Sequence, residues 1–200
     1  MKPLTNSKQR LMDAARHLIW RSSYGTTTVD AICEKAEVKK GSFYYFFKSK
    51  SDLAVTALRS DWENNRGFFE KLFSGPPLER FQKFYTFVFE GQSGIKTRHG
   101  RVLGCPLFSL GCEVSTIDAE IGAVVKDILN QYLAHMEKAI REAQEQGLVA
   151  VSDPGAKARC VFSYFEGALT QARIENNVEP LKALYPTTLE IIGAHTAQAA

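Results

Sequence analysis

The stretch from Val38 to Lys50 constrains the fold of this chain more than any other. It reads Val-Lys-Lys-Gly-Ser-Phe-Tyr-Tyr-Phe-Phe-Lys-Ser-Lys, with a turn followed by a short aromatic run. Phe43 and Phe47 are four residues apart, so on a helix they share one face and can fix that helix to a core. Tyr44 and Tyr45 then point elsewhere. The stretch predicts a short helix that offers its tyrosines to a partner.

Lysines stand at both ends of this aromatic run, at positions 39, 40, 48 and 50. Positive charge around aromatic and hydroxyl groups suits a phosphate backbone with base edges between the phosphates. We therefore predict a helix-turn-helix whose second helix enters the major groove of double-stranded DNA. The alternative is that the lysines form a solvated surface and the tyrosines a core.

The charge of the chain is unevenly distributed. The formal net charge is +3, but residues 1–50 hold ten basic and four acidic residues, a net +6. The remaining residues hold fifteen basic and eighteen acidic residues, a net −3. A basic first quarter on a mildly acidic remainder indicates that only the first quarter meets a polyanion.

Several protein classes lack support in the sequence. The four cysteines form no C-x-x-C pair and have no histidine at metal-ligand spacing, so neither a metal nor another cofactor is expected. A serine elbow and a glycine-rich phosphate loop after a strand are missing, which argues against an enzyme. The chain has no apolar signal region and no apolar run that could span a bilayer, so we expect a cytoplasmic protein without a membrane partner.

Apolar residues recur at helical spacing along the whole chain, and no strand pattern is present. We predict an all-α fold of about nine helices. The first helix is expected over residues 7–22, and Thr27 with Asp30 fits a capping box at the start of the second. A helix over 78–90 is followed by a glycine-containing loop over 91–104, and the last helix is expected from Pro186.

Two segments carry a resemblance to a known family. Gly25–Ile32 and Gly41–Leu53 resemble the TetR family of bacterial transcriptional regulators. The resemblance implies a three-helix DNA-binding domain over residues 1–50 and a helical ligand-binding and dimerisation domain over residues 51–200. Glu37 is a departure, because the family usually has glycine there, in a turn that often needs a left-handed backbone.

The helix model and the resemblance together predict the DNA contacts. By resemblance, Ser42 and Tyr44 contact DNA and Lys50 contacts a phosphate. The helix model places other residues in or beside the groove or at a neighbouring phosphate. The predicted DNA-binding residues are Thr27, Thr28, Lys39, Lys40, Gly41, Ser42, Tyr44, Tyr45, Lys48 and Lys50.

A single helix-turn-helix reads few base pairs, so a specific site requires two of them on one body, reading a palindrome. The resemblance implies a homodimer in which the last two helices of each subunit form a four-helix interface. Without the resemblance, these helices would be interpreted as ordinary core. The predicted interface residues are Phe165, Gly167, Ala168, Leu169, Leu189, Ile192 and Gly193.

The larger domain is also expected to hold a small-molecule pocket. An apolar cavity with a few polar groups suits an aromatic or lipophilic effector. Each lining residue taken alone is more simply interpreted as plain core. The predicted lining is Phe84, Phe87, Cys105, Phe108, Cys112, Tyr132, Phe162 and Glu166.

These predictions combine into one functional hypothesis. The chain is expected to be a repressor that binds a palindromic operator as a dimer and is released by a small apolar or aromatic effector through a population shift. Two alternatives remain open. One is a thiol-responsive regulator that uses Cys105 or Cys112, and the other is a protein that coats DNA without sequence preference.

Overall fold

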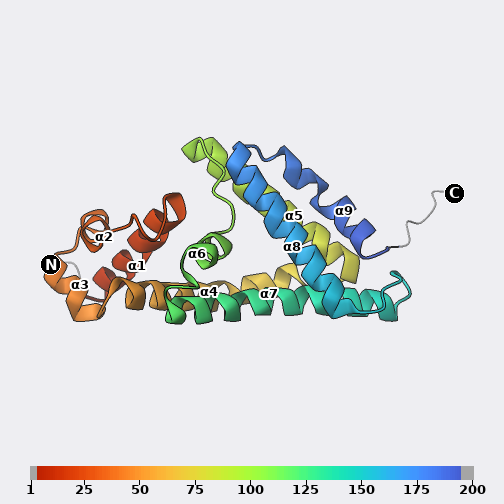
Figure 1. The fold of residues 1–200 in the computed structure, drawn as a ribbon, viewed down its shortest axis with the longest axis horizontal. Coiled ribbons are helices and arrows are strands. Elements are labelled where there is room, and N and C mark those ends of the chain that lie inside the picture. The colour runs from red at the N-terminus through yellow and green to blue at the C-terminus, as the bar shows by residue number, and fades with distance from the viewer. Residues whose placement is uncertain (1–3, 195–200) are drawn as a thin grey trace. The chain divides into compact units, whose positions relative to one another are not determined.

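The computed structural model describes residues 4–194. This range contains nine α-helices, one 3-10 helix and no strand beyond an isolated bridge between Val149 and Ala194, which confirms the predicted all-α fold (Figure 1). The elements are α1 (Leu4–Arg21), α2 (Val29–Ala36), α3 (Lys40–Phe46), α4 (Lys50–Leu72), α5 (Pro77–His99), α6 (Pro106–Val114), α7 (Ala119–Glu145), α8 (Pro154–Glu175), η1 (Glu179–Ala183) and α9 (Leu184–Ile191).

The chain divides into two compact units. The first contains the residues up to Arg66 together with Pro106–Ile128, and the second contains Gly67–Cys105 and the residues from Leu129 onwards. The helices α4 and α7 each contribute residues to both units. The functional boundary expected near residue 50 stays a prediction.

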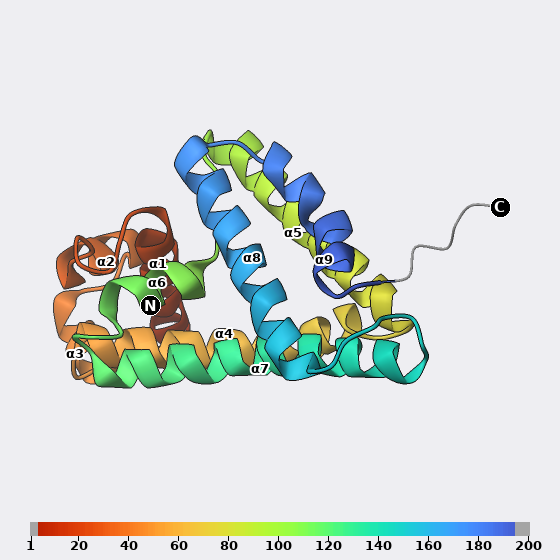
Figure 2. The ribbon, with the colours of Figure 1, turned by 45° about the vertical axis from the view of Figure 1, so that its right-hand side comes forward.

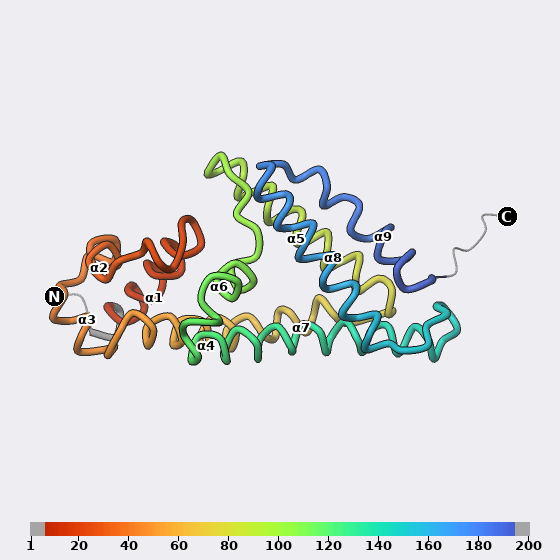
Figure 3. Tube along the Cα trace, viewed as in Figure 1, coloured from red at the N-terminus to blue at the C-terminus, as the bar shows by residue number. Residues whose placement is uncertain are grey.

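The first three helices follow one another at the red and orange end of the trace in Figure 3. A cluster of buried side chains holds them together. Leu11 of α1, Ile32 of α2 and Phe43 of α3 have no exposed surface, and Phe47 is 2% exposed. Burying each of these large side chains stabilises the unit by roughly 2 kcal/mol. The aromatic spacing noted in the sequence therefore fixes α3 to α1 and α2.

In the second unit, α9 lies alongside α5 and α8 (Figure 2). The buried hydroxyl groups of Tyr85 on α5 and Thr188 on α9 form a hydrogen bond of 2.9 Å. Arg80 of α5 forms an ion pair with Glu142 of α7. These polar contacts fix the relative positions of helices that otherwise meet through aromatic rings.

The loop predicted over residues 91–104 is wrong, because α5 continues to His99. Gly91 is tolerated on its exposed side, and the buried Gln92 side chain accepts hydrogen bonds from the N–H groups of Leu103 and Gly104. The helix ends only at Gly100, whose φ of 72° lies in the left-handed region. The last helix also begins earlier than predicted, at Leu184, directly after η1.

Between residues 4 and 194, no helix has both the length and the apolar character that crossing a bilayer requires.

Candidate nucleic-acid interface and effector site

The turn between α2 and α3 depends on Glu37. Its φ of 52° and ψ of 46° are left-handed, the conformation that the family's glycine often adopts in this turn. The Glu37 N–H group donates to the Glu34 carbonyl at 3.0 Å, and the Arg10 guanidinium donates to the Glu37 carbonyl at 3.0 Å. A left-handed non-glycine residue costs about 1 kcal/mol. These bonds keep the turn in place despite that cost.

The helix α3 presents one face to solvent. Its buried side carries Phe43, whereas Tyr44 is 56% and Tyr45 74% exposed. A Cβ atom added at Gly41 would meet nothing within 4 Å, so this glycine leaves open space at the start of the helix. Ser42 is half-buried, and Lys39, Lys40 and Lys48 are exposed. The predicted residues of this stretch are therefore all at least partly exposed.

At the start of α2 the predicted capping box is wrong. The N-cap is Thr28, whose hydroxyl accepts from the Ala31 N–H group at 3.1 Å. Thr27 is 3% exposed and donates its hydroxyl inward to the Ser23 carbonyl at 2.7 Å. The Thr27 hydroxyl is thus turned away from the surface predicted to meet DNA, while Thr28 stays exposed.

The predicted partner of Thr27, Asp30, forms an exposed ion pair with Lys40 at 2.7 Å. The hydrogen bond that Lys40 donates to the Asp30 carboxylate raises the pKa of Lys40. Exposed pairs of this kind contribute little stability. Lys40 is therefore charged, and replacing Asp30 by a phosphate as its ion-pair partner would cost little.

Lys50 has a structural role that the sequence did not reveal. Its ammonium donates to the carbonyls of Tyr24 at 2.8 Å and Thr27 at 2.9 Å, and lies 4.1 Å from the centre of the Tyr24 ring. Burial lowers the pKa of Lys50. An ammonium has three donors, so one remains for a phosphate. The phosphate contact implied by the resemblance stays a prediction.

A second cluster surrounds Glu166 on α8, in the other unit. The Glu166 side chain is 1% exposed, and neither carboxylate oxygen has a nitrogen or oxygen hydrogen-bond partner among the described residues. Burial raises its pKa to about 7, and a hydrogen bond from the thiol of Cys105 acts in the opposite direction. Burial raises the pKa of Tyr132 on α7, and the negative charges of Cys105 and Glu166 raise it further.

Aromatic rings connect the other side chains of this cluster. Phe84 and Phe162 both pack against Phe165, with ring centres 5.1 and 6.3 Å apart. Phe69 stacks on Tyr132 at 4.4 Å and meets Phe84 at 5.7 Å. We refer to Phe84, Cys105, Tyr132, Phe162 and Glu166 as the Glu166 cluster. These five predicted lining residues all belong to the second unit.

Comparison with known proteins identifies the family. Residues 11–57 match the model described as bacterial regulatory proteins, tetR family, and residues 77–187 match the model described as tetracyclin repressor-like, C-terminal domain. The chain belongs to the TetR family. It is accordingly a DNA-binding transcriptional regulator with an N-terminal helix-turn-helix, as the sequence predicted.

Individual relatives of this TetR-family chain agree with the assignment. The transcriptional regulator AcuR of Cereibacter sphaeroides is 30% identical over 183 residues, which are 90% of this chain and 82% of AcuR. The transcriptional repressor DhaR of a Mycobacterium species is 27% identical over 94% of this chain and 96% of its own. A crystal structure of a regulatory protein TetR from Rhodobacter sphaeroides superposes with a TM-score of 0.81 at 28% identity, covering 92% of this chain and 97% of that one.

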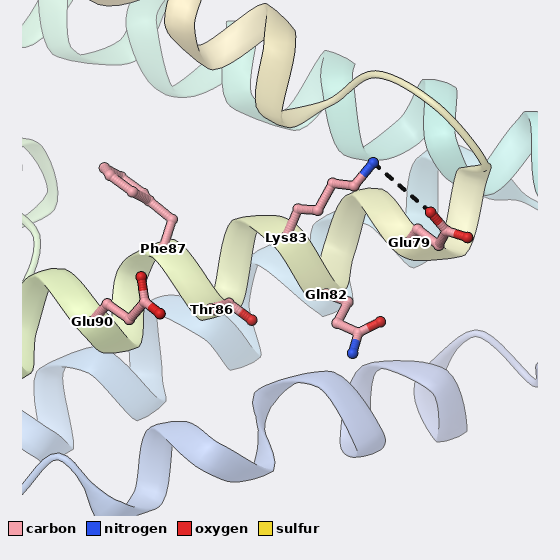
Figure 4. A pocket seen from close by; sticks show the side chains of 6 residues that line it. All are labelled: Glu79, Gln82, Lys83, Thr86, Phe87 and Glu90. Carbon is pink, nitrogen blue, oxygen red and sulfur yellow. Dashed lines mark ion pairs between the residues drawn. The ribbon is translucent and has the colours of Figure 1, made fainter.

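Three residues predicted for the effector pocket lie outside the Glu166 cluster. Phe87 is 46% exposed, because it lies off the buried stripe of α5, and its ring meets that of Phe68 edge to face with centres 5.1 Å apart. It borders a surface hollow with Glu79 and Lys83, which form an ion pair (Figure 4). Phe108 and Cys112 belong to α6 in the first unit, where Cys112 is exposed.

The residues predicted for a dimer interface also separate into two groups. Phe165, Leu169 and Ile192 are at most 3% exposed within the subunit, so their side chains are not available to a partner. Ala168 and Leu189 are half-buried, and Gly167 and Gly193 are exposed. Helical spacing marked the buried residues correctly but did not distinguish burial inside one subunit from burial between two.

Proposed function

We propose that this TetR-family regulator is a repressor that binds a palindromic operator as a homodimer and is released by a small-molecule effector. The observation that carries the proposal is the exposed α3 surface, in which Tyr44 and Tyr45 project from a helix fixed by Phe43 and Phe47. Relatives of this chain include a protein named as a transcriptional repressor.

Within the operator, the tyrosines of α3 face base edges and the lysines face phosphates. Gly41, Ser42, Tyr44 and Tyr45 enter the major groove, with Gly41 allowing close approach of the backbone. Thr28 and the lysines position the helix on the backbone without reading sequence. The proposed phosphate contacts are Thr28, Lys39, Lys40, Lys48 and the remaining donor of Lys50.

Dimerisation is assigned to the outer side of α8 and the end of α9. The exposed residues Cys160, Ser163, Gly167 and Ile174 recur along α8 at helical spacing, and Ile174 is 79% exposed. A Cβ atom at Gly167 would meet nothing within the subunit, so a second helix can approach closely here. This exposed stripe replaces Phe165, Leu169 and Ile192 as the source of interface area.

Selection of bound duplexes from a random library, followed by footprinting, tests the proposal. We expect one protected palindrome with half-sites separated by one helical turn or a multiple of it. Uniform protection along every duplex tested would instead support a protein that coats DNA without sequence preference.

The dimer is tested separately by sedimentation of the variant Gly167→Arg, which we expect to be monomeric and to lose operator affinity. Gly91→Arg is the matched control, because Gly91 is also an exposed helical glycine with open space at its Cβ position. If Gly167→Arg is still a dimer, this side of α8 does not form the interface.

A thiol-responsive regulator is the second candidate, and the half-buried Cys105 thiol beside the Glu166 carboxylate favours it. In this case the Cys105 sulfur adds to one carbon of an activated C=C bond while its proton passes to Glu166, and the enolate formed from the broken π bond takes a proton back from Glu166. N-ethylmaleimide should then release wild-type protein from its operator but not Cys105→Ser. Release that is lost only in Cys112→Ser would assign the response to Cys112.

A further inference from the structure

We propose that the effector is a lipophilic organic cation, an amine or ammonium group on an apolar or aromatic body, whose charge is bound by Glu166. The inference rests on the proposed function, because it assumes that the second unit holds the effector site. It adds the chemical class of the effector and the residue that selects it.

The first argument is that Glu166 is an exception among buried polar side chains. Thr27 donates to the Ser23 carbonyl, Arg80 pairs with Glu142, and Thr188 bonds to Tyr85. Gln92 uses its amide oxygen and nitrogen with Leu103 and Gly104. Glu166 is as deeply buried as these residues, but neither of its oxygens has a nitrogen or oxygen partner within the described residues, and the Cys105 thiol is only a weak donor.

A buried carboxylate without a strong donor or a counter-charge is costly, because it has lost its hydration and gained little in exchange. A ligand that supplies a positive charge removes this cost, whereas a neutral ligand removes none of it. A ligand with its own carboxylate adds repulsion. The carboxylate therefore discriminates among effectors of similar shape by their charge.

The second argument is the aromatic environment of the carboxylate. Phe162 and Phe165 lie on the same helix as Glu166, and Phe84 packs against Phe165 with ring centres 5.1 Å apart. Tyr132, whose pKa is raised in part by the charge of Glu166, stacks on Phe69. Aromatic faces attract cations and also bury an apolar body. The cluster thus suits both parts of a lipophilic cation.

The third argument concerns access. Glu166 itself is 1% exposed, but Cys105 and Tyr132 beside it are half-buried and reach the surface of the unit. A ligand reaches the carboxylate only when these side chains move. Binding therefore favours a conformation of the second unit other than the one described, which is what an effector must do to shift an equilibrium.

Three probes of one shape and different charge test the inference on the full-length protein. They are 3-phenylpropylamine, 3-phenylpropan-1-ol and 3-phenylpropanoate, measured by calorimetry at neutral pH. We expect the amine to bind at least about tenfold more tightly than the alcohol, and the carboxylate more weakly still. In Glu166→Gln the amine and the alcohol should bind with similar affinity.

Two further variants keep the test decisive. Glu166→Asp retains the charge and should retain the preference for the amine, which covers the case in which Glu166→Gln does not fold. Glu175→Gln removes an exposed carboxylate from the same helix and should leave the preference unchanged. Equal binding of amine and alcohol to the wild type, no binding of any probe at millimolar concentration, or a preference that survives in Glu166→Gln overturns the inference.

The operator complex separates this inference from the proposed function. If the alcohol binds as well as the amine and still releases the protein from its operator, the effector-responsive repressor stands and the cation assignment falls. If the protein without any probe binds no discrete operator, the proposed function falls, whatever the probes do.

Discussion

The carboxylate of Glu113 on α6 accepts a hydrogen bond of 2.7 Å from the backbone N–H group of Gly25. Its second oxygen accepts from the N–H group of Tyr24 at 2.9 Å. Both donors lie in the loop that leads into α2. The Lys50 ammonium donates a hydrogen bond to the Tyr24 carbonyl in the same loop. Within the first unit, α6 is therefore bound directly to the loop that positions the helix-turn-helix.

The variant Glu113→Ala tests this connection. We expect it to reduce the free energy of unfolding by about 1 kcal/mol, because two hydrogen bonds to an exposed carboxylate are lost. Amide hydrogen exchange at Tyr24 and Gly25 should accelerate, and operator affinity should fall although no DNA contact has changed. Glu120→Ala, an exposed carboxylate on α7 in the same unit, is the control. Unchanged exchange at both amides would contradict the connection.

Gly41→Ala should separate stability from DNA binding. The new methyl group meets nothing within the subunit, and alanine favours a helix over glycine, so the unfolding free energy should rise by about 0.5 kcal/mol. Operator affinity should nevertheless fall, because the methyl group occupies the space offered to the groove.

Gly67→Ala is the matched control for this prediction. Gly67 is also an exposed helical glycine with open space at its Cβ position, on α4. The substitution should stabilise the protein and leave the operator affinity unchanged. A Gly41→Ala protein with wild-type affinity would mean that DNA does not approach the start of α3.

Glu37→Gly should stabilise the protein by about 1 kcal/mol, because glycine adopts a φ of 52° without the penalty paid by other residues. The ion pair with Arg10 that is lost spans 3.7 Å at an exposed site and contributes little. Urea unfolding measures the change. Glu37→Ala keeps the strain and loses the same ion pair, so it should show no gain, and equal gains in both variants would rule out backbone strain as the cause.

Local features were predictable from the sequence because their causes are local. The spacing of Phe43 and Phe47 determined which side of α3 is buried. The sequence marked Glu37 as a departure in the turn but did not decide its backbone, which is left-handed. The bond between Glu113 and Gly25 spans 88 positions, and no local pattern indicates it.

The sequence also could not show whether an apolar residue is buried by a partner subunit or by its own. Leu169 and Ile192 follow the apolar spacing of an interface, but they are buried by their own subunit. The loop expected over residues 91–104 was wrong for a related reason. Glycine composition suggested an irregular segment, whereas the buried contacts of Gln92 with the following segment keep α5 helical.

Substitutions of Lys48 and Lys50 should affect DNA binding in different ways. Lys48→Ala should weaken binding to all sequences alike and reduce the slope of log affinity against log salt by about 1, as expected for one phosphate contact.

Lys50→Ala should reduce the salt slope similarly and also lower the unfolding free energy, because the carbonyls of Tyr24 and Thr27 lose their donor. If the salt slope of either variant is unchanged, that lysine does not contact DNA. If Lys50→Ala is as stable as the wild type, Lys50 has no structural role.

Glu166 should make the stability of the protein depend on pH in a defined direction. Burial raises its pKa from 4.5 to about 7, so between these values the folded protein binds a proton that the unfolded chain has released. The free energy of unfolding therefore falls by about 3 kcal/mol as the pH rises from 4.5 through 7, and stays low above that.

Glu166→Gln cannot titrate, so it isolates this contribution from the other carboxylates. Thermal unfolding of both proteins should show that the variant gains stability over the wild type as the pH rises from 5 to 8, with most of the change completed by about pH 7.5. Glu175→Gln, which removes an exposed carboxylate of the same helix, is the control. A constant difference for Glu166→Gln would show that the carboxylate keeps its ordinary pKa, and hence that it finds a partner or water in solution.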